Sequence, residues 1–307
     1  MLAGAWGSEI FRQTVLIVLA SLFLSGLVMY FLKNKGHYFY ISWFSIKSWL
    51  FFAPILFIFF GLPAPWPLVF LTCIAIYGSK VFFQMMGMYH RSYFVIVTYL
   101  GIIGLAFTVQ AGNRNLYNLV PMVVLLGLCL IPLARNNYKS MIQYISLANL
   151  AFVFLGWSFM HLGLLMELEK GIYQLMYLII LTEFCDNTNL AIARSVGKWK
   201  LFDRIDRKRT VESTLVSGTL TVALAFAMRH LLPDGSDKYW LSAGVVASLG
   251  GLLGDYVMTV IRRDAGIKVV GAFIWGRGDF LHRMDRLIFV APIYFHWMAY
   301  LSSQGGR

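Results

Sequence analysis

The sequence predicts an all-α, polytopic integral membrane protein of about nine or ten transmembrane helices. Hydrophobic residues make up 59% of the chain, charged residues make up 13%, and the mean hydropathy is +0.69. A soluble domain is typically about half apolar and a quarter charged. Ten apolar segments approach the roughly 20 residues that a membrane helix needs; they lie at 11–32, 48–62, 66–86, 92–110, 116–134, 141–165, 171–192, 213–232, 239–261 and 287–303. The second is short and precedes three prolines, so it either spans the membrane or is re-entrant.

Positive charges predict the orientation of these segments. The net charge is +12, and with ten spans the Lys and Arg clusters fall on loops of one side. Because cytoplasmic loops are enriched in Lys and Arg, both termini are expected outside, with the basic loops on the cytoplasmic face of a bacterial inner membrane. This pattern indicates contact with lipid and not with nucleic acid. The three cysteines lie in apolar stretches and are expected to be small core residues without a disulfide framework.

Acidic residues divide the chain into two regions. No Asp or Glu lies between Glu9 and Glu167, so residues 1–165 are expected to form a membrane scaffold and lipid-facing wall. Residues 166–307 hold every later acid and include the cytoplasmic loops 194–212 and 262–286. Chemistry that depends on carboxylates is therefore expected on the cytoplasmic side of this C-terminal region, which we interpret as the catalytic type of region.

Three acids lie within apolar segments, namely Glu183, Asp186 and Asp255. A carboxylate at this depth costs about 2.5–3.5 kcal/mol even on the lenient insertion scale, and it usually faces a polar cavity. The first two are three residues apart, which places them on one helix face. Carboxylates at similar depth predict a Mg²⁺ site, because Mg²⁺ takes one or two carboxylates together with substrate phosphates. The alternative is structural: the pair is solvated or bound to Arg194, while Asp255 pairs with a nearby Arg behind a glycine-lined helix contact around Gly254.

The loop 198–212, KWKLFDRIDRKRTVE, is strongly basic and has Trp199, Phe202 and Ile205 at intervals of three residues. One interpretation is an interfacial amphipathic helix over the mouth of the site. The other is an ordinary basic loop of the cytoplasmic face. In both cases its composition favours an anionic lipid headgroup or nucleotide phosphates, because Lys and Arg form charge-assisted hydrogen bonds with phosphate.

A signature of charged residues and glycines follows in the C-terminal third. Its residues are Gly254, Asp255, Thr259, Arg262, Arg263, Asp264, Lys268, Gly276, Gly278, Arg283 and Asp285, preceded by Glu183, Asp186, Gly197, Lys198, Arg209, Thr210 and Glu212. In order and spacing, residues 180–303 resemble the bacterial phosphatidate cytidylyltransferases, also called CDP-diacylglycerol synthases. The signature of that family reads approximately S-x-x-K-R-D-x-x-x-K-D and then P-G-H-G-G-x-x-D-R-x-D, after a G-D pair in a membrane helix. E-x-x-D and K-T-x-E elements lie upstream of it.

The resemblance implies transfer of CMP from CTP to phosphatidate or a related lipid phosphate, which gives CDP-diacylglycerol and pyrophosphate in phospholipid biosynthesis. It implies Mg²⁺, with a second monovalent cation as an option, and a homodimer. The implied metal ligands are Asp255, Glu183 and Asp186, with Asp279 and His282 as further candidates. The implied catalytic residues are Asp255, Asp285 and Arg263, where Asp285 orients Arg283 or reaches the metal. The implied phosphate-binding residues are Arg262, Lys268, Arg283, Lys198 and Arg209.

Several residues depart from the family signature: Trp275 and the pair Asp206-Arg207, and above all the four residues Val269, Arg277, Asp279 and His282. Two hypotheses therefore stay open. The first is a divergent cytidylyltransferase, which the retained intramembrane acids favour because unused acids at that depth cost stability. The second is a catalytically altered or inactive paralogue that binds an anionic lipid or assists a partner, which the four departures favour. A transporter would be expected to show repeats with broken helices, and the sequence shows no internal repeat.

Overall fold

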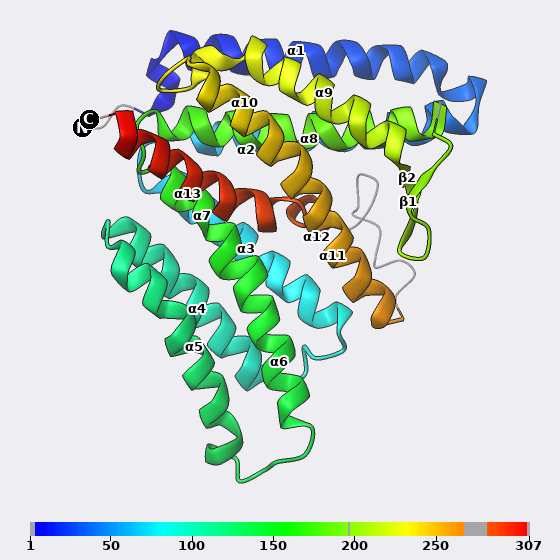
Figure 1. Cartoon of the computed structure of the whole chain (residues 1–307). Coiled ribbons are helices and arrows are strands. Elements are labelled where there is room, and N and C mark those ends of the chain that lie inside the picture. Colours follow the sequence, from blue (N-terminus) through cyan, green and yellow to red (C-terminus); the bar gives the residue numbers. More distant parts are fainter. Residues whose placement is uncertain (1–3, 196, 267–280, 306–307) are drawn as a thin grey trace.

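The computed structural model describes residues 4–195, 197–266 and 281–305. The N-terminal region contains α1 (Glu9–Leu32), α2 (His37–Gly61), α3 (Trp66–Met85), α4 (Ser92–Gln110), α5 (Arg114–Ala134), α6 (Met141–Ala151) and α7 (Phe159–Leu165). The C-terminal region contains α8 (Gly171–Ser195), β1 (Lys200–Phe202), β2 (Asp206–Thr210), α9 (Val211–Ala227), α10 (Asp237–Val245), α11 (Gly251–Asp264), α12 (Leu281–Met284) and α13 (Leu287–Gly305). The start of α1 and the end of α13 lie at one end of the molecule, and the β1–β2 hairpin lies at the opposite end (Figure 1).

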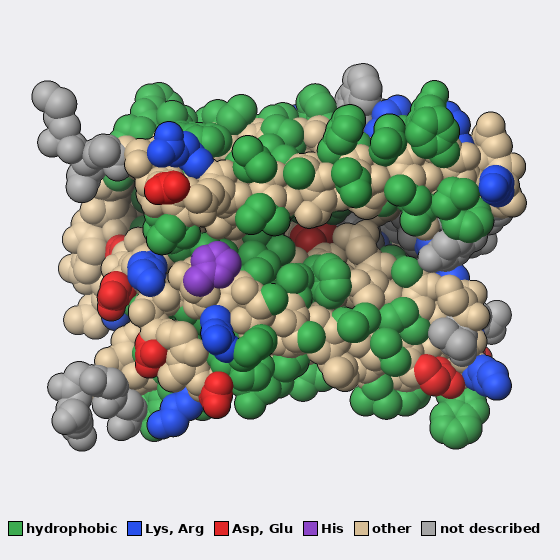
Figure 2. Space-filling model, turned by 90° about the horizontal axis from the view of Figure 1, so that it is seen from above, with side chains coloured by type: hydrophobic (Ala, Val, Ile, Leu, Met, Phe, Trp, Pro, Cys, Tyr) green, Lys and Arg blue, Asp and Glu red, His purple; other side chains and the backbone are tan. Residues whose placement is uncertain are grey.

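The helices confirm an all-α polytopic membrane protein. Seven helical segments of the described chain are long and apolar enough to cross a membrane: 9–35, 42–61, 66–85, 92–110, 114–134, 141–165 and 237–264. Two shorter apolar helices, 211–227 and 287–303, correspond to two further expected segments. The remaining expected segment is α8, whose 25 residues include Glu183, Asp186 and Arg194. On the face seen in Figure 2, hydrophobic side chains cover the middle, while charged side chains gather toward the two ends.

Two of the expected segments are helices with a π-helical stretch inside them. Residues 152–158 join α6 to α7, and residues 246–250 join α10 to α11. A π-helical stretch widens a helix by one residue per turn and occurs frequently at functional sites. The second stretch ends one turn before Asp255, so it determines how this part of α11 faces its neighbours.

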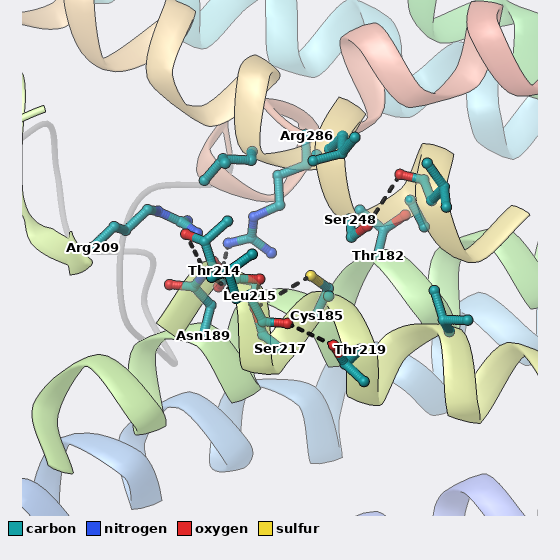
Figure 3. Close-up of a pocket in the computed structure, with 18 residues that line it drawn as sticks. Thr182, Cys185, Asn189, Arg209, Thr214, Leu215, Ser217, Thr219, Ser248 and Arg286 are labelled. Carbon is teal, nitrogen blue, oxygen red and sulfur yellow. Dashed lines mark hydrogen bonds and ion pairs between the residues drawn. The ribbon is translucent and has the colours of Figure 1, made fainter. Parts of the chain in front are cut away.

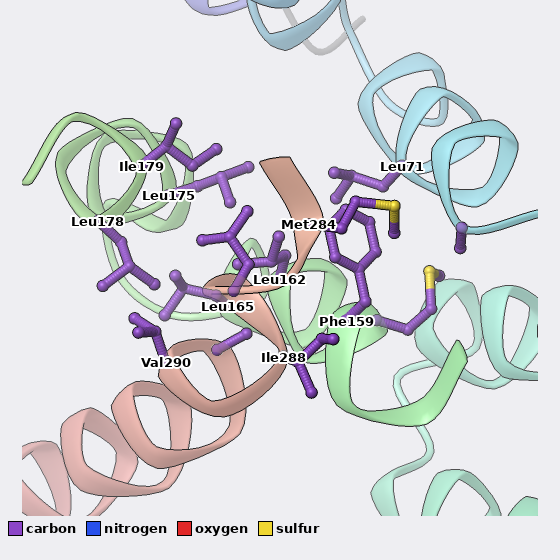
Figure 4. Close-up of a cluster of buried hydrophobic side chains, with 14 of the residues drawn as sticks. Leu71, Phe159, Leu162, Leu165, Leu175, Leu178, Ile179, Met284, Ile288 and Val290 are labelled. Atoms are coloured by element: carbon purple, nitrogen blue, oxygen red, sulfur yellow. The ribbon is translucent and has the colours of Figure 1, made fainter. Parts of the chain in front are cut away.

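The hydrophobic core lies where the two regions meet. Figure 4 shows Phe159 and Leu162 of α7 packed with Ile179 of α8, Met284 of α12 and Ile288 of α13. Between membrane helices, such side chains stabilise the fold through van der Waals packing and not through transfer from water. In this core α7 contacts both α8 and α13. Acids of α8 meet a cation from the turn before α13, as described below.

Close approach of α11 to the start of α13 depends on glycine, as the sequence predicted. A Cβ atom at Gly254 would collide with the backbone of Asp285 and lie 3.0 Å from the Cα atom of Arg286. A Cβ at Gly250 would lie 3.1 Å from the side chain of Val290 and 3.5 Å from its Cα atom. Only residues without side chains at these positions let the two backbones come so near.

The structure decides between alternatives that the sequence left open for two segments, and it corrects one expectation, that of three core cysteines. The loop 198–212 forms an antiparallel hairpin, in which Lys200 pairs with Thr210 and Phe202 pairs with Asp206, and not an amphipathic helix. Backbone pairing between the two strands replaces the helical bonds that the three-residue spacing suggested. The second apolar segment belongs to a 25-residue helix that continues through Pro54. Two of the three cysteines, Cys73 and Cys129, are exposed on the surface of the helices and are not core residues.

Candidate active site

Glu183 and Asp186 face the same partner, as their spacing on α8 predicted. The guanidinium of Arg286, at the start of α13, donates from Nη1 to Oε2 of Glu183 at 3.3 Å. Its Nη2 atom forms an ion pair with Oδ2 of Asp186. Asp186 and Arg286 are both buried, and Glu183 is half-buried. The two acids thus bind one cation from a neighbouring helix.

Arg209 of β2 joins the acids of two helices. Its Nη2 atom lies 2.6 Å from Oδ1 of Asp186 on α8 and 2.7 Å from Oδ2 of Asp255 on α11. Its Nε atom is 3.8 Å from Oδ2 of Asp206 on the same strand. The side chain of Arg209 is only 4% exposed, so it points from the hairpin into the bundle. A charged hydrogen bond between buried groups is stronger than a neutral one, and here one nitrogen serves two carboxylates.

The carboxylates keep Arg209 charged despite its burial. Burial lowers the pKa of the Arg209 guanidinium, but the charges of Asp255 and Asp186 raise that pKa by more, so the net shift is upward from the ordinary arginine value. An isolated buried charge would cost several kcal/mol. The guanidinium and the two acids are therefore mutually dependent, because removal of any one of them would leave the buried charge of the others less compensated.

Arg286 is the functional residue that reasoning from the sequence missed. Arg286 directly follows Asp285 and directly precedes the apolar run of α13. A cation at this position can pair with the intramembrane acids. Because charged residues at that depth are rarely left without a partner, an Arg at the edge of an apolar segment is the signal that could have identified it. The signature drew attention instead to Arg283, one turn earlier.

Asp285 and Arg283 do not form the pair that was expected. Asp285 is fully buried and forms an ion pair with Arg262 of α11. Arg283 points to α2, where it donates to Ser48 and lies over the ring of Trp49, with its guanidinium carbon 4.4 Å from the ring centroid. The helical turn from 281 to 284 separates the two side chains, so each binds a different helix.

The hairpin that carries Arg209 is attached at a few points on its outer side. The carboxylate of Glu212 accepts from the backbone amides of Lys198 and Trp199 at 3.1–3.3 Å. Arg263 donates from Nη1 to the backbone oxygen of Arg204 at 3.0 Å. The side chains of Arg263 and Lys198 are exposed at this end of the molecule. Lys198 is thus an exposed residue of the predicted phosphate-binding set, and Arg263 is an exposed residue of the predicted catalytic set.

Two other contacts hold the hairpin in place. The ring of Phe202 packs edge-on against Tyr256 of α11, with centroids 4.9 Å apart. At the base of β2, Thr210 caps α9 by accepting from the amide of Ser213, whose hydroxyl in turn accepts from the amide of Thr210. This reciprocal cap fixes the point at which the hairpin becomes a membrane helix. Arg209 directly precedes that fixed point.

A cavity of about 340 Å³ opens beside the two arginines, between α8, α9 and the α10–α11 segment. Figure 3 shows Arg209 and Arg286 pointing toward each other at one end of it. Its polar walls are formed by small side chains, Thr182, Cys185, Asn189, Thr214, Ser217, Thr219 and Ser248. Two apolar side chains that also line it, Leu215 and Leu249, are 66% and 54% exposed. The cavity therefore has Arg209, Arg286 and Asp186 at one end, several hydroxyl side chains in its walls and a largely apolar lining.

Some of the predicted site residues cannot be placed. Lys268 and Asp279, together with Val269 and Arg277, lie outside the described residues. The backbone of His282 is part of α12, but its side chain is outside the described part. The hypotheses that involve these residues stay predictions.

The arrangement of the acids was compared with what a metal ion needs. Asp186 and Asp255 do come together from two helices, but the guanidinium of Arg209 lies between them. Arg286 occupies the other oxygen of Asp186. Within the ranges that the structure describes, no three His, Cys, Asp or Glu side chains gather as a metal site. In this arrangement the residues do not fit a Mg²⁺ ion between Asp186 and Asp255. For Asp255, the described contacts correspond to the structural alternative, a pairing with arginine.

The fold and these buried charges define a polytopic membrane protein with a polar site between its C-terminal helices. The sequence profile of the cytidylyltransferase family matches residues 43–301, which is most of the chain. The chain therefore belongs to the cytidylyltransferase family, a family of transferases. The match includes α2 to α13, so it covers both the N-terminal helices and the site.

Individual relatives agree with that assignment. An uncharacterized protein of Escherichia coli, YnbB, is 32% identical over 135 residues, or 44% of this chain and 45% of that protein. The phosphatidate cytidylyltransferase of Staphylococcus aureus is 26% identical over 163 residues, or 52% of this chain and 61% of that one. The phosphatidate cytidylyltransferase of Staphylococcus saprophyticus is 26% identical over 204 residues, which is 64% of this chain and 76% of that protein. The chain thus aligns with about half of the length of the first two of these proteins.

Proposed function

We propose that the protein transfers a cytidylyl group from CTP to phosphatidate or a related lipid phosphate. The observation that carries this proposal is the pair of buried arginines, Arg209 and Arg286, which acids hold at the end of a largely apolar cavity. A lipid phosphate has the matching chemistry, because its headgroup is anionic and its chains are apolar. Membership of the cytidylyltransferase family and the names of the staphylococcal relatives support CTP as the other substrate.

In the proposed reaction, an oxygen of the lipid phosphate attacks the α-phosphorus of CTP. A new phosphorus–oxygen bond forms, and the bond from the α-phosphorus to the oxygen that bridges to the β-phosphate breaks. The electron pair leaves with pyrophosphate, and CDP-diacylglycerol or its analogue remains in the membrane. Such a displacement depends on positioning and positive charge more than on a covalent protein nucleophile. The arginines of this site are suited to supplying that charge.

The residues have the following proposed roles. Arg263 and Lys198, at the exposed end, hold the triphosphate of CTP, together with Arg262 and Lys268. Arg286 and Arg209, at the cavity, face the lipid phosphate. Asp255 and Asp285 hold the guanidinium groups of Arg209 and Arg262 in place, and Arg283 positions α12 against α2. In this scheme the exposed end of the molecule faces the cytoplasm of a bacterial inner membrane.

The direct test is incubation of the purified protein with labelled CTP, phosphatidate and Mg²⁺, followed by separation of the lipid products. We expect the wild type to form labelled CDP-diacylglycerol. The Asp255→Asn variant is expected to lose at least about 100-fold in turnover, because preorganised charge of this kind is typically worth that much. Asp203→Asn, at an exposed acid of the same hairpin, is the matched control and is expected to retain turnover. Full turnover of Asp255→Asn would contradict the proposed role of this acid.

The second candidate is a paralogue that binds an anionic lipid without transferring a nucleotide. The observation that favours it is that both oxygens of Asp186 are bound by arginines in the described state. Substitutions at Val269, Arg277, Asp279 and His282 point the same way. Absence of product with several lipid phosphates and several metals, together with retained phosphatidate in native mass spectra of the purified protein, would favour this candidate over the first.

A further inference from the structure

We propose that Asn189 of α8 is a positioning residue for Arg209. Its buried amide ties the start of α9 to α8 and so sets the direction in which Arg209 enters the cavity. The consequence for turnover rests on the proposed function, since it concerns the same site. The contacts behind the proposal belong to this chain alone and depend on no reaction.

Asn189 lies on the face of α8 that carries Asp186. The two residues are three positions apart, so their side chains point to the same side of the helix. Asp186 accepts from Arg209 at 2.6 Å, and α9, which begins two residues after Arg209, packs against α8. Asn189 is only 2% exposed and forms part of the cavity wall (Figure 3). An uncharged amide is thus buried about one helical turn beyond the acid that binds Arg209.

Both ends of the Asn189 amide bind the first turns of α9. Its Nδ2 atom donates to Oγ1 of Thr214 at 3.3 Å and to Oγ of Ser217 at 3.2 Å. Its Oδ1 atom accepts from the hydroxyl of Ser213 at 3.1 Å. A side-chain amide has two hydrogens and one carbonyl oxygen to offer. All of them are directed at the same neighbouring helix.

These bonds are not needed to satisfy the hydroxyl groups of α9. The hydroxyls of Ser213 and Thr214 lie 2.9 Å and 3.0 Å from the carbonyl oxygen of Thr210. The hydroxyl of Ser217 donates to the carbonyl oxygen of Thr214 at 3.3 Å. Each hydroxyl therefore has an acceptor close by in its own segment. What Asn189 adds is a connection between two helices, which is a common role of polar side chains between membrane helices.

The connection reaches Arg209 through the cap of α9. Ser213, which donates to Asn189, exchanges bonds of 3.1 Å and 3.2 Å with Thr210, each backbone amide donating to the hydroxyl of the other residue. Thr210 directly follows Arg209, and both are buried. The backbone beside Arg209 is thereby held to α8, and its guanidinium is held to the same helix by Asp186. Two anchors on one helix determine where this side chain begins and where it points.

Chemical modification of Arg209 in the purified protein, without nucleotide or added lipid, tests the proposal. Phenylglyoxal modifies accessible arginines, and mass spectrometry of the peptide that contains Arg209 reports the rate. We expect Asn189→Ala to raise this rate about two- to tenfold, the factor that corresponds to the loss of one hydrogen bond of ordinary net strength.

Asn187→Ala is the matched control. Asn187 is the same residue type on the same helix, but it is exposed and accepts from Ser45 of α2. Its substitution is expected to change the modification rate of Arg209 by less than about twofold, as is usual for exposed positions. Equal rates in Asn189→Ala and Asn187→Ala would overturn the proposal.

Ser213→Ala provides a second variant in case Asn189→Ala does not fold. It removes the hydroxyl through which Asn189 reaches the cap, and it is expected to raise the modification rate of Arg209 as well. Where both variants fold, the double variant should react more slowly than the product of the two increases predicts, because both substitutions interrupt one path. An unchanged rate in Ser213→Ala, or the full product in the double variant, would contradict the proposal.

The proposed reaction supplies a further readout. Arg209 faces the lipid phosphate in that scheme, whereas exposed residues hold CTP. Asn189→Ala is therefore expected to lower kcat by up to about a hundredfold, as small misplacements of a binding group can, and to leave the KM for CTP nearly unchanged. Asn187→Ala should alter neither constant. An equal fall of kcat in the two variants would indicate general destabilisation and would count against a positioning role.

The outcomes for Asn189 and for the reaction are distinguishable. Modification is measured without nucleotide, so the positioning of Arg209 can be demonstrated in a protein that forms no CDP-diacylglycerol. Conversely, an active enzyme in which Arg209 reacts at the same rate in Asn189→Ala and in the wild type would retain the proposed function and lose this inference.

Discussion

The N-terminal and C-terminal helices bury polar groups in different ways. In α3 and α4, the buried hydroxyls of Ser79 and Thr98 bond to backbone oxygens four residues earlier in their own helices. In the C-terminal region, charged groups are buried as well as hydroxyls, and Arg209 and Arg286 bind acids that belong to other elements. Local bonds satisfy a side chain without fixing any neighbour. Bonds between elements, in contrast, determine where α8, α11, α13 and the hairpin lie relative to one another.

This difference favours the C-terminal region as the location of the functional site. Buried ion pairs are expensive, because the desolvation penalty can exceed the attraction between the charges, so they are weak evidence for stability. In a membrane, they usually mark a functional site. The N-terminal helices contain no Asp or Glu after Glu9, which agrees with a scaffold. The scaffold nevertheless reaches the site, because Ser48 and Trp49 of α2 bind Arg283.

Substitution of one charge in the network should show the largest effect on stability. Arg286→Met leaves the buried carboxylate of Asp186 with one cation fewer, and we expect a loss of about 3–5 kcal/mol, as is typical when one partner of a buried pair is removed. Thr98→Val, the counterpart in the N-terminal region, removes one local bond and should cost about 0.5–1.5 kcal/mol. Unfolding of both variants in detergent measures the difference. Equal losses would mean that the two regions do not differ as described.

The next largest difference in stability between the two regions is expected for glycine-to-alanine substitutions. Gly254→Ala places a methyl group against the backbone of Asp285 and Arg286, and overpacking of this kind typically costs about 1–3 kcal/mol. A Cβ at Gly104 of α4 meets nothing within 4 Å. Gly104→Ala is therefore expected to stabilise its helix by about 0.8–1.0 kcal/mol. The melting temperatures should move in opposite directions, and a stabilised Gly254→Ala would refute the close contact.

A double-mutant cycle across the boundary tests whether α2 belongs to the site. Arg283→Gln and Trp49→Leu are each expected to lower stability, and their effects should not add. The coupling free energy is expected to be about 0.5–2 kcal/mol, the usual size of a cation–π contact. The unfolding free energies of the wild type, the two single variants and the double variant provide the measurement. Additive effects would confine the site to the C-terminal region.

The smallest effect concerns pH and the attachment of the hairpin. The carboxyl of Glu212 accepts hydrogen bonds from its own backbone amide and from the amides of Trp199 and Lys198. These bonds lower the pKa of that carboxyl below its usual value of about 4.5. Because the pKa of Glu212 is lower in the folded protein than in the unfolded chain, the stabilisation from these hydrogen bonds is complete above the unfolded-state pKa. It is lost as the pH falls through the folded-state pKa. At neutral pH we expect Glu212→Gln to speed hydrogen exchange at the amides of Lys198 and Trp199. An unchanged exchange rate would remove Glu212 from the attachment.

Several parts of the site could be predicted from the sequence because they follow from short-range geometry. The positions of Glu183 and Asp186 on one helix face follow from their spacing. The close helix contact at Gly254 follows from the absence of a side chain, and the membrane helices follow from the length and hydropathy of apolar segments. Each of these depends on residues that are near one another in the chain, so the pattern contains the needed information.

The partners of the acids could not be predicted in the same way. Arg209 and Asp255 are 46 residues apart in the chain, and Arg286 and Glu183 are 103 residues apart. Seven arginines from 194 to 263 and further ones after 263 were available to these acids, and charge alone does not choose among them. The hairpin in place of a helix was missed for a related reason, because strand pairing depends on the neighbouring strand and not on spacing within one segment.

By itself, the sequence determined the membrane character of the protein, its helical fold class and the C-terminal location of its acids, because hydropathy and charge are sums over local residues. Its signature determined the family resemblance that the family match then confirmed. Only the tertiary structure decided that Arg209 lies between Asp186 and Asp255, that Arg286 holds the acids of α8, and that Arg283 binds α2. The physical reason is that a buried charge takes the partner which packing brings within reach, and packing is a property of the whole bundle.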